Sequence, residues 1–361
     1  AVAVTKDKRA GELLLSRLTK EPDLAARAAL IDALGELREV QAVPELVKIL
    51  SGDQELLLVH AAGALGQIGE KSSPTAEAAM PAIEPMGRLL TGLGGKSASP
   101  EVREAMARAL GRMGSKQSLD ALVAALDDES INVRFYAAKG LGNIADLGGR
   151  AVDGLLAHLT DPDKGVRSAV AITLGKLSDD RVVQAIAAQL MPTSSEKDAE
   201  VRAALWRSLI AIQKRQTDPS VPAALGDQFA VYGDKPSLDG AVQLYEIAVD
   251  KSDVASGNGR LHSLRLKLAD AYIQSRQPGK AATLLQELLK SPKDDADRAI
   301  LQRRLAEAQL QIPPYVPGAQ ALAAIAKTEP AGGLAGILKL VFDQAQSLQA
   351  ADKAADALAV L

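Results

Sequence analysis

The sequence of 361 residues contains no cysteine, and only 2% of its residues are aromatic. Without cysteine the chain cannot form a disulfide, attack a substrate with a thiol, or hold a metal or haem through thiolates. The shortage of aromatic residues also disfavours a β-sandwich or a β-barrel, since strands favour aromatic and β-branched side chains. Alanine and leucine are abundant instead, so the composition predicts an all-α chain of closely packed helices.

The chain also lacks an excess of charge and a long apolar run. Its formal net charge is −3, whereas nucleic-acid binding usually needs a basic stripe, so we expect no nucleic-acid partner. No apolar run approaches the ~18 residues of a membrane span, so we expect a soluble chain without membrane insertion. The sequence begins at Ala1, without Met and without a signal-peptide pattern. This start and the absence of cysteine favour an exported or periplasmic location over a cytoplasmic one, although the compartment stays unknown.

Residues that carry common chemistry are scarce as well. The three histidines, His60, His158 and His262, are not followed by Glu, so a His-Glu iron-ligand pair and a zinc-binding HExxH motif are both missing. The stretch Gly92–Ser97 ends like a phosphate-binding loop, but Leu90 takes the place of the first glycine, and an apolar helix precedes it. We therefore expect no catalytic, cofactor-binding or metal-binding residues, no cofactor and no enzymatic activity.

The chain instead repeats a short pattern at intervals of 31 to 45 residues. A Leu-Gly pair closes an apolar run in five copies, at Gly35, Gly66, Gly111, Gly142 and Gly175. Eight residues before this anchor, five of six copies carry an arginine: Arg27, Arg103, Arg134, Arg167 and Arg202. The small and apolar residues in between recur at helical spacing, and we expect the glycine to end this helix with positive φ.

A second apolar helix precedes the first in most copies, as in "SLDALVAAL" and "AVDGLLAHL". Short acidic turns such as "DDES" and "DPD" separate the two helices and supply residues that cap the following helix. Each copy is therefore predicted to be a helix hairpin. A single hairpin cannot bury its own apolar face, so neighbouring copies must stack to cover it.

This pattern resembles the HEAT repeat, in the short form of ~30 residues first associated with phycobilin lyases, over about residues 8–215. The resemblance implies an α-α superhelix, a right-handed solenoid in which arginines tie one repeat to the next. By resemblance, Arg103, Arg134, Arg167 and Arg202 pair with acidic groups such as Asp128, Asp161 or Asp163. All five repeat arginines, including Arg27, are then structural ties rather than ligand-binding groups.

The register of the pattern changes after residue 216. The stretch "LADAYIQSRQPGKAATLLQELLKSP" resembles a tetratricopeptide repeat (TPR), and a weaker copy covers residues 221–251. The positions that carry the resemblance are Leu268, Ala269, Tyr272, Ala281, Leu285 and Pro292. We predict three parts: a HEAT-like array over 1–216 with a loop insertion near 70–100, TPR-like helical repeats over 217–311, and C-terminal helices over 312–361 that form a capping segment or a truncated array.

Stacked helical repeats favour a non-enzymatic scaffold or adaptor that binds a protein or peptide partner, whose identity the sequence does not give. Specificity should lie in residues that depart from the repeat. The candidates are the insertion, which is otherwise a solvated loop, the Phe135-Tyr136 pair, and a TPR-like groove. The pair is either an exposed anchor for a partner or part of the core. The groove residues are Lys267, Tyr272, Gln274 and Arg276, which are otherwise a solvated helix face.

Two other functions stay open at this point. One is an enzyme or accessory factor of the phycobilin-lyase kind, with a small-molecule pocket on the solenoid, although the repeat itself carries no such chemistry. The other is nucleic-acid binding through the only tryptophan, Trp206, which stands beside Arg202 and Arg207. The missing basic excess and the few aromatic residues disfavour it.

Overall fold

The structure is a computed structural model and describes residues 8–93, 98–255, 258–327 and 331–361. The described residues form α-helices joined by turns and short 3-10 helices, with no strand among them, so the prediction of an all-α fold is confirmed. Within the described part, no helix is both long and apolar enough to cross a bilayer. The chain divides into two compact units, Ala1–Leu190 with Ser194–Ile212, and Met191–Thr193 with Gln213–Leu361. The division lies near the predicted boundary at residue 216, and the three-part organisation stays a prediction.

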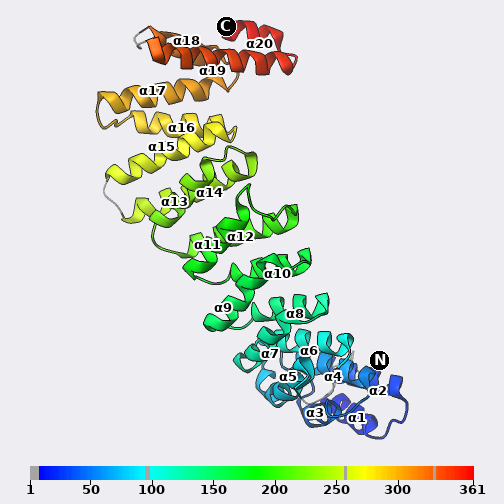
Figure 1. The fold of residues 1–361 in the computed structure, drawn as a ribbon. Helices are drawn as coiled ribbons and strands as arrows, with labels where there is room; N and C mark the ends of the chain where they lie inside the picture. The colour runs from blue at the N-terminus through cyan, green and yellow to red at the C-terminus, as the bar shows by residue number, and fades with distance from the viewer. Residues whose placement is uncertain (1–7, 94–97, 256–257, 328–330) are drawn as a thin grey trace. The chain divides into compact units, whose positions relative to one another are not determined.

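The first unit is a succession of helix hairpins, each made of an A helix and the B helix that follows it (Figure 1). The A helices are α1 (Lys8–Leu18), α3 (Val43–Ile49), α5 (Ile83–Thr91), α7 (Leu119–Ala124), α9 (Gly148–Ala157) and α11 (Asp180–Leu190). The B helices are α2 (Leu24–Glu36), α4 (Glu55–Ile68), α6 (Pro100–Met113), α8 (Ile131–Leu141), α10 (Lys164–Leu174) and α12 (Ala199–Arg215). Each B helix from α2 to α8 packs against the next B helix, so these helices form one continuous layer.

Small residues let the B helices approach one another closely. Ala107 on α6 and Ala138 on α8 are fully buried between helices. A Cβ added to Gly111 would lie 2.6 Å from the Cα of Gly140, so the backbones of α6 and α8 nearly touch. The expectation that the Leu-Gly glycines end their helices with positive φ is wrong, since Gly142 and Gly175 have φ of −64° and −59°. These glycines are required by close packing, because a side chain would push the repeats apart.

The insertion near residues 70–100 is not one loop. Residues Ala76–Ala82 form a 3-10 helix that leads directly into α5, although serine and proline dominate its start. Ala79 and Ala82 are fully buried, so this segment is held by packing in the place where other repeats begin their A helix. Helix α5 ends at Gly92, whose φ of +68° is accessible to glycine at little cost.

The second unit continues with helix hairpins. Its helices are α13 (Ser220–Ala230), α14 (Lys235–Ala255), α15 (Asn258–Gln274), α16 (Pro278–Leu289), α17 (Asp295–Leu310), α18 (Val316–Ala326), α19 (Ala331–Ala350) and α20 (Ala354–Val360). Helices α17 to α20 share one apolar core that includes Leu310, Leu322 and Ile337. The C-terminal helices therefore belong to the packed body of this unit. Three large apolar side chains of α19, Leu338, Leu340 and Phe342, stay exposed.

Candidate functional site

Three of the repeat arginines bridge consecutive A-to-B turns with the same geometry. Arg134, on α8, donates through Nε and Nη2 to the two carboxylate oxygens of Asp161, at 2.8 and 3.1 Å. Its Nη1 donates to the carbonyl oxygen of Asp128, in the turn of its own repeat, at 2.9 Å. Arg103 pairs in the same two-pronged way with Asp128, at 2.7 and 2.9 Å. Each guanidinium thus joins the turn of its own repeat to the turn of the next.

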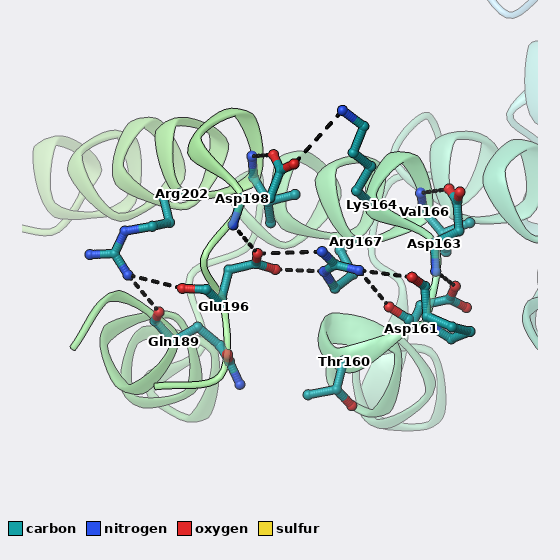
Figure 2. A network of polar contacts seen from close by, with 12 residues as sticks. Thr160, Asp161, Asp163, Lys164, Val166, Arg167, Gln189, Glu196, Asp198 and Arg202 are labelled. Carbon is teal, nitrogen blue, oxygen red and sulfur yellow. Dashed lines mark hydrogen bonds and ion pairs between the residues drawn. The ribbon is translucent and has the colours of Figure 1, made fainter. Parts of the chain in front are cut away.

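Figure 2 shows the continuation of this chain of contacts through Arg167. Arg167 donates through Nε and Nη2 to Glu196, at 2.5 and 3.3 Å, and through Nη1 to the carbonyl oxygen of Asp161 at 2.8 Å. The resemblance implied an acidic partner such as Asp163, but that carboxylate instead caps the N-terminus of α10 by accepting from the backbone N–H of Val166. We call this series of ion pairs the arginine ladder; it consists of Arg103 with Asp128, Arg134 with Asp161, and Arg167 with Glu196.

The two ends of the ladder depart from this geometry. Arg202 donates to the carbonyl oxygens of Gln189 and Leu190, at 3.4 and 2.8 Å, rather than to a carboxylate. At the other end, the Nε of Arg27 is buried and has no hydrogen-bond partner among the described residues. The inter-repeat pairing is therefore complete for Arg103, Arg134 and Arg167, and the role of all five arginines as ties stays a prediction.

Burial and charge act in opposite directions on Asp161. Its side chain is only 2% exposed, and burial disfavours the charged form, but hydrogen bonds from Arg134 and from the backbone N–H of Asp163 outweigh that effect and lower the pKa of Asp161. The hydrogen bond with Asp161 in turn raises the pKa of Arg134, despite its own burial. Both groups are committed to the fold, which leaves the exposed positions of the B helices for function.

Those exposed positions form a varied surface over α6, α8 and α10. The rings of Phe135 and Tyr136 lie 5.2 Å apart in an edge-to-face arrangement, and both side chains are half-buried. The guanidinium of Arg108, on α6, lies 4.4 Å from the centre of the Tyr136 ring and donates to its hydroxyl at 3.0 Å. Arg108 of the neighbouring repeat thus holds Tyr136 by a cation–π contact and a hydrogen bond.

A hollow of about 620 Å³ lies next to Phe135, between α8 and α10. Its apolar lining includes Phe135, Ala169 and Ile172, and Ile172 is 48% exposed. Lys164 and Glu200 stand at one end, with Nζ and Oε2 3.4 Å apart. Lys139, Asn143 and Lys176 line the other end. The hollow is open to solvent, and it offers an apolar floor between two polar ends.

Sequence reasoning named Phe135 but missed Ile172, Lys139 and Lys176. A usable signal was present, because Lys139 and Ile172 both stand five residues after their repeat arginine, and Lys176 stands nine after. Those positions are exposed in the three repeats whose arginine joins the ladder, on the B helix or within two residues of its end, and each repeat carries a different residue type there. Positions that are exposed in each of these repeats but differ in residue type indicate the surface that is not used for stacking.

The residues of the predicted TPR-like groove do not form one open surface. Tyr272 is 8% exposed, and its hydroxyl donates to Glu246 at 2.7 Å; burial and that carboxylate raise its pKa. The Nζ of Lys267 lies 2.7 Å from a carboxylate oxygen of Asp227. Gln274 and Arg276 are exposed at the end of α15 and beyond it. The groove therefore lacks an available aromatic anchor, and binding by its polar residues stays a prediction.

The histidines are tied into local structure. The Nδ1 of His60 lies 2.7 Å from Oδ1 of Asp32, and the Nε2 of His262 lies 2.8 Å from Oδ1 of Asp297. The Nδ1 of His158 lies 2.8 Å from the carbonyl oxygen of Gly154. Within the described ranges, no group of three His, Cys, Asp or Glu side chains is placed to hold a metal ion. Of the phosphate-loop-like stretch Gly92–Ser97, residues 94–97 lie outside the described part. Trp206 is half-buried on α12.

Family comparison agrees with this architecture. The sequence matches the family model of HEAT repeats over residues 11–83, 88–160, 127–210 and 152–231, which together make up more than half of the chain. The chain therefore belongs to the HEAT repeat family, and the predicted resemblance is confirmed for its first part. A search of curated proteins gives no significant match. The TPR-like character of residues 217–311 stays a prediction.

Solved structures with a similar course of helices include designed and natural repeat proteins. An engineered protein is 20% identical, with 97% of this chain and 97% of that chain covered and a TM-score of 0.44. A designed armadillo repeat protein in complex with the peptide (KR)4 is 20% identical, with 55% and 98% covered and a TM-score of 0.42. The complex of CpcE and CpcF of phycocyanin lyase from Nostoc sp. PCC7120 gives 18% identity, 68% and 84% coverage and a TM-score of 0.35.

Proposed function

We propose that the chain is a non-enzymatic scaffold that binds an extended segment of a partner protein on the B-helix surface of its first unit. The single observation that supports this proposal most is the open hollow between α8 and α10, where Phe135 and Ile172 form an apolar floor. An exposed isoleucine beside an aromatic ring loses its contact with water when an apolar side chain covers it. That burial is the usual source of affinity at the centre of an interface.

The arginine ladder also supports this proposal. Arg103, Arg134 and Arg167 each pair with a carboxylate of the next turn, and we expect these pairs to fix the spacing of the repeats. A surface built on such rigid layers loses little conformational freedom when a partner binds, which favours affinity. The hollow accordingly lies on side chains that vary between repeats.

The test begins with a random peptide library displayed on phage and selected on the immobilised full chain. Selected peptides are then titrated against the variant Phe135→Ala and against Phe342→Ala. The second variant removes a phenyl ring that is 55% exposed on α19 in the other unit, so it controls for general loss of exposed aromatic surface. We expect Phe135→Ala to weaken binding at least tenfold, or ~1.4 kcal/mol, and Phe342→Ala to leave it unchanged. Peptides that respond only to Phe342→Ala would place the binding surface elsewhere.

The phycobilin-lyase alternative predicts a different ligand. A small-molecule pocket of that kind would retain a bilin on the full chain, seen as a red-shifted absorption band after gel filtration, and Phe135→Ala or Ile172→Ser would abolish the band. The hollow is partly open to solvent and is not an enclosed cavity, which favours an extended peptide.

A further inference from the structure

Three lysines gather where α8 ends. Lys71 donates through Nζ to the carbonyl oxygen of Asn143 at 2.6 Å, and Lys176 donates to the carbonyl oxygen of Gly142, one residue earlier, at 2.6 Å. Lys139 lies in the last turn of α8 and lines the hollow together with Asn143 and Lys176. Two ammonium groups from distant segments of the chain thus bind the carbonyl end of α8, and a third lysine belongs to its last turn.

The positive charge of this lysine cluster is not neutralised by the fold. None of the three lysines pairs with a carboxylate of the described residues. Glu70, the sequence neighbour of Lys71, is held by Arg38 and lies 3.7 Å from Arg112. The carbonyl end of a helix carries about half a negative charge, which offsets only part of three full charges.

Donor capacity is also left over. An ammonium group has three N–H donors, and Lys71 and Lys176 each use one on a backbone carbonyl. Burial and, to a lesser extent, the charge of Lys71 lower the pKa of Lys176. A bound anion would relieve this repulsion and accept the remaining N–H groups.

We propose that this lysine cluster binds the carboxylate of an acidic residue in the partner peptide, two positions away from an apolar residue seated on Phe135 and Ile172. The inference rests on the proposed function. Lys176 follows the end of α10 by two residues, and backbone hydrogen bonds from Gly175 to Ala171 and from Lys176 to Thr173 continue the helical course there. Lys176 therefore lies about one turn beyond Ile172, a rise of about 5.4 to 6 Å. Alternate side chains of an extended peptide lie about 6.8 Å apart on the same side. One apolar and one acidic side chain at that spacing therefore match the floor and the basic end of the hollow.

The opposite end of the hollow favours a single carboxylate over a polyanion. Asp163 and Glu200 line that end, where Asp163 caps α10 and Glu200 pairs with Lys164. A nucleic-acid strand that ran along the hollow would bring phosphates next to these carboxylates, which would repel them. A peptide with one acidic residue avoids this repulsion.

The test uses the full chain and fluorescein-labelled peptides, with binding measured by fluorescence anisotropy. The probe is Ser-Leu-Ser-Glu-Ser-Leu-Ser-Glu-Ser-Leu-Ser, which offers leucine and glutamate two positions apart in both directions, and its partner has glutamine in place of glutamate. We expect the glutamate peptide to bind about tenfold tighter. Lys176→Gln and Lys71→Gln should each weaken it about fivefold while leaving the glutamine peptide unaffected. Lys48→Gln on α3 removes the same charge away from the hollow and should change neither affinity.

Three results would overturn the inference, and they differ from a failure of the proposed function. If the two peptides bind equally and the lysine variants have no effect, while Phe135→Ala weakens both, the apolar floor is correct and the carboxylate site is wrong. If Lys48→Gln weakens the glutamate peptide as much as Lys176→Gln, only net charge matters. If a labelled deoxythymidine ten-mer binds tighter than the glutamate peptide and depends on Lys176, the cluster serves nucleic acid. Failure of Phe135→Ala to weaken either peptide would instead remove the proposed function.

Discussion

Removal of Arg134 should destabilise the first unit far more than removal of an exposed arginine from an ion pair of similar geometry. Arg134→Ala deletes two hydrogen bonds to Asp161 and two to the backbone carbonyls of Asp128 and Glu129. The side chains of Arg134 and Asp161 are 11% and 2% exposed, so water cannot replace the lost partner. The variant therefore leaves a buried carboxylate with one remaining donor, the backbone N–H of Asp163.

The expected loss of stability in Arg134→Ala follows from the burial of the ion pair. Breaking a buried ion pair by removal of one partner costs about 3 to 5 kcal/mol, and the remaining N–H bond to Asp161 places this case near the lower value. Arg181 supplies the matched control, because it forms ion pairs with Asp153 and Asp179, at 2.7 and 2.9 Å, while its own side chain is 54% exposed. An exposed pair of this kind contributes at most about 1 kcal/mol. The two variants should thus differ by about 2 kcal/mol.

Hydrogen exchange followed by mass spectrometry is the suitable assay, because stacked repeats can open one layer at a time and a global unfolding curve would average over them. Peptides from α8 and α10 report the free energy of opening at the two turns that Arg134 joins. We expect Arg134→Ala to lower this free energy by about 3 kcal/mol, while Arg181→Ala changes it by less than about 1 kcal/mol. Equal effects of the two variants would refute the view that the ladder stabilises the array through burial.

Three further predictions follow from the same contacts. The lowered pKa of Asp161 means that the ionised carboxylate stabilises the fold; its contribution is present above the ordinary value of about 3.9 and is lost as the pH falls through the lowered one. Asp161→Asn should therefore flatten the loss of stability between pH 5 and pH 2 in urea titrations, and an unchanged slope would contradict this. Gly111→Ala should destabilise by about 2 kcal/mol because a Cβ there would lie 2.6 Å from a neighbouring Cα, whereas Gly63→Ala on α4, which meets nothing within 4 Å, should stabilise slightly in thermal melts. Because burial and the charge of Lys71 lower its pKa, Lys176 should react with an acylating reagent at pH 9 faster than Lys48, as measured by mass spectrometry of tryptic peptides. Equal rates would contradict the lowered pKa of Lys176.

Much of the fold could be predicted from the sequence because each repeat obeys the same packing constraint. Arginine, small residues and Leu-Gly recur at a fixed register, so they reveal which side chains face the next layer. The pairs of Arg103 and Arg134 with Asp128 and Asp161 were implied by the family resemblance. The role of the glycines could not be predicted from the sequence. A glycine at the end of a helical pattern looks the same whether it provides positive φ or allows a neighbouring helix to approach closely.

The candidate site could be predicted only in part. Phe135 departs from the repeat by its size and is visible in the sequence, while Tyr272 matches a family position and turned out to be buried against Glu246. The lysine cluster was out of reach because Lys71 and Lys176 are 105 residues apart in the sequence, and only the stacking of several repeats brings their ammonium groups to the same helix end. Side chains that come together only when distant repeats stack produce no recognisable local pattern in the sequence.

The central claim is that a partner peptide binds over α8 and α10, and the NMR resonance of one methyl group tests it most directly. The chain is labelled at its isoleucine δ1 methyl groups and titrated with the leucine-glutamate peptide, with the Ile172 resonance assigned by Ile172→Val. Ile300 on α17 is the internal control, because both isoleucine side chains are 48% exposed. The account predicts a saturable shift of the Ile172 methyl resonance with an unmoved Ile300 resonance. Binding of the peptide without a shift at Ile172, or with a shift of Ile300 alone, would contradict the assignment of the binding surface to α8 and α10.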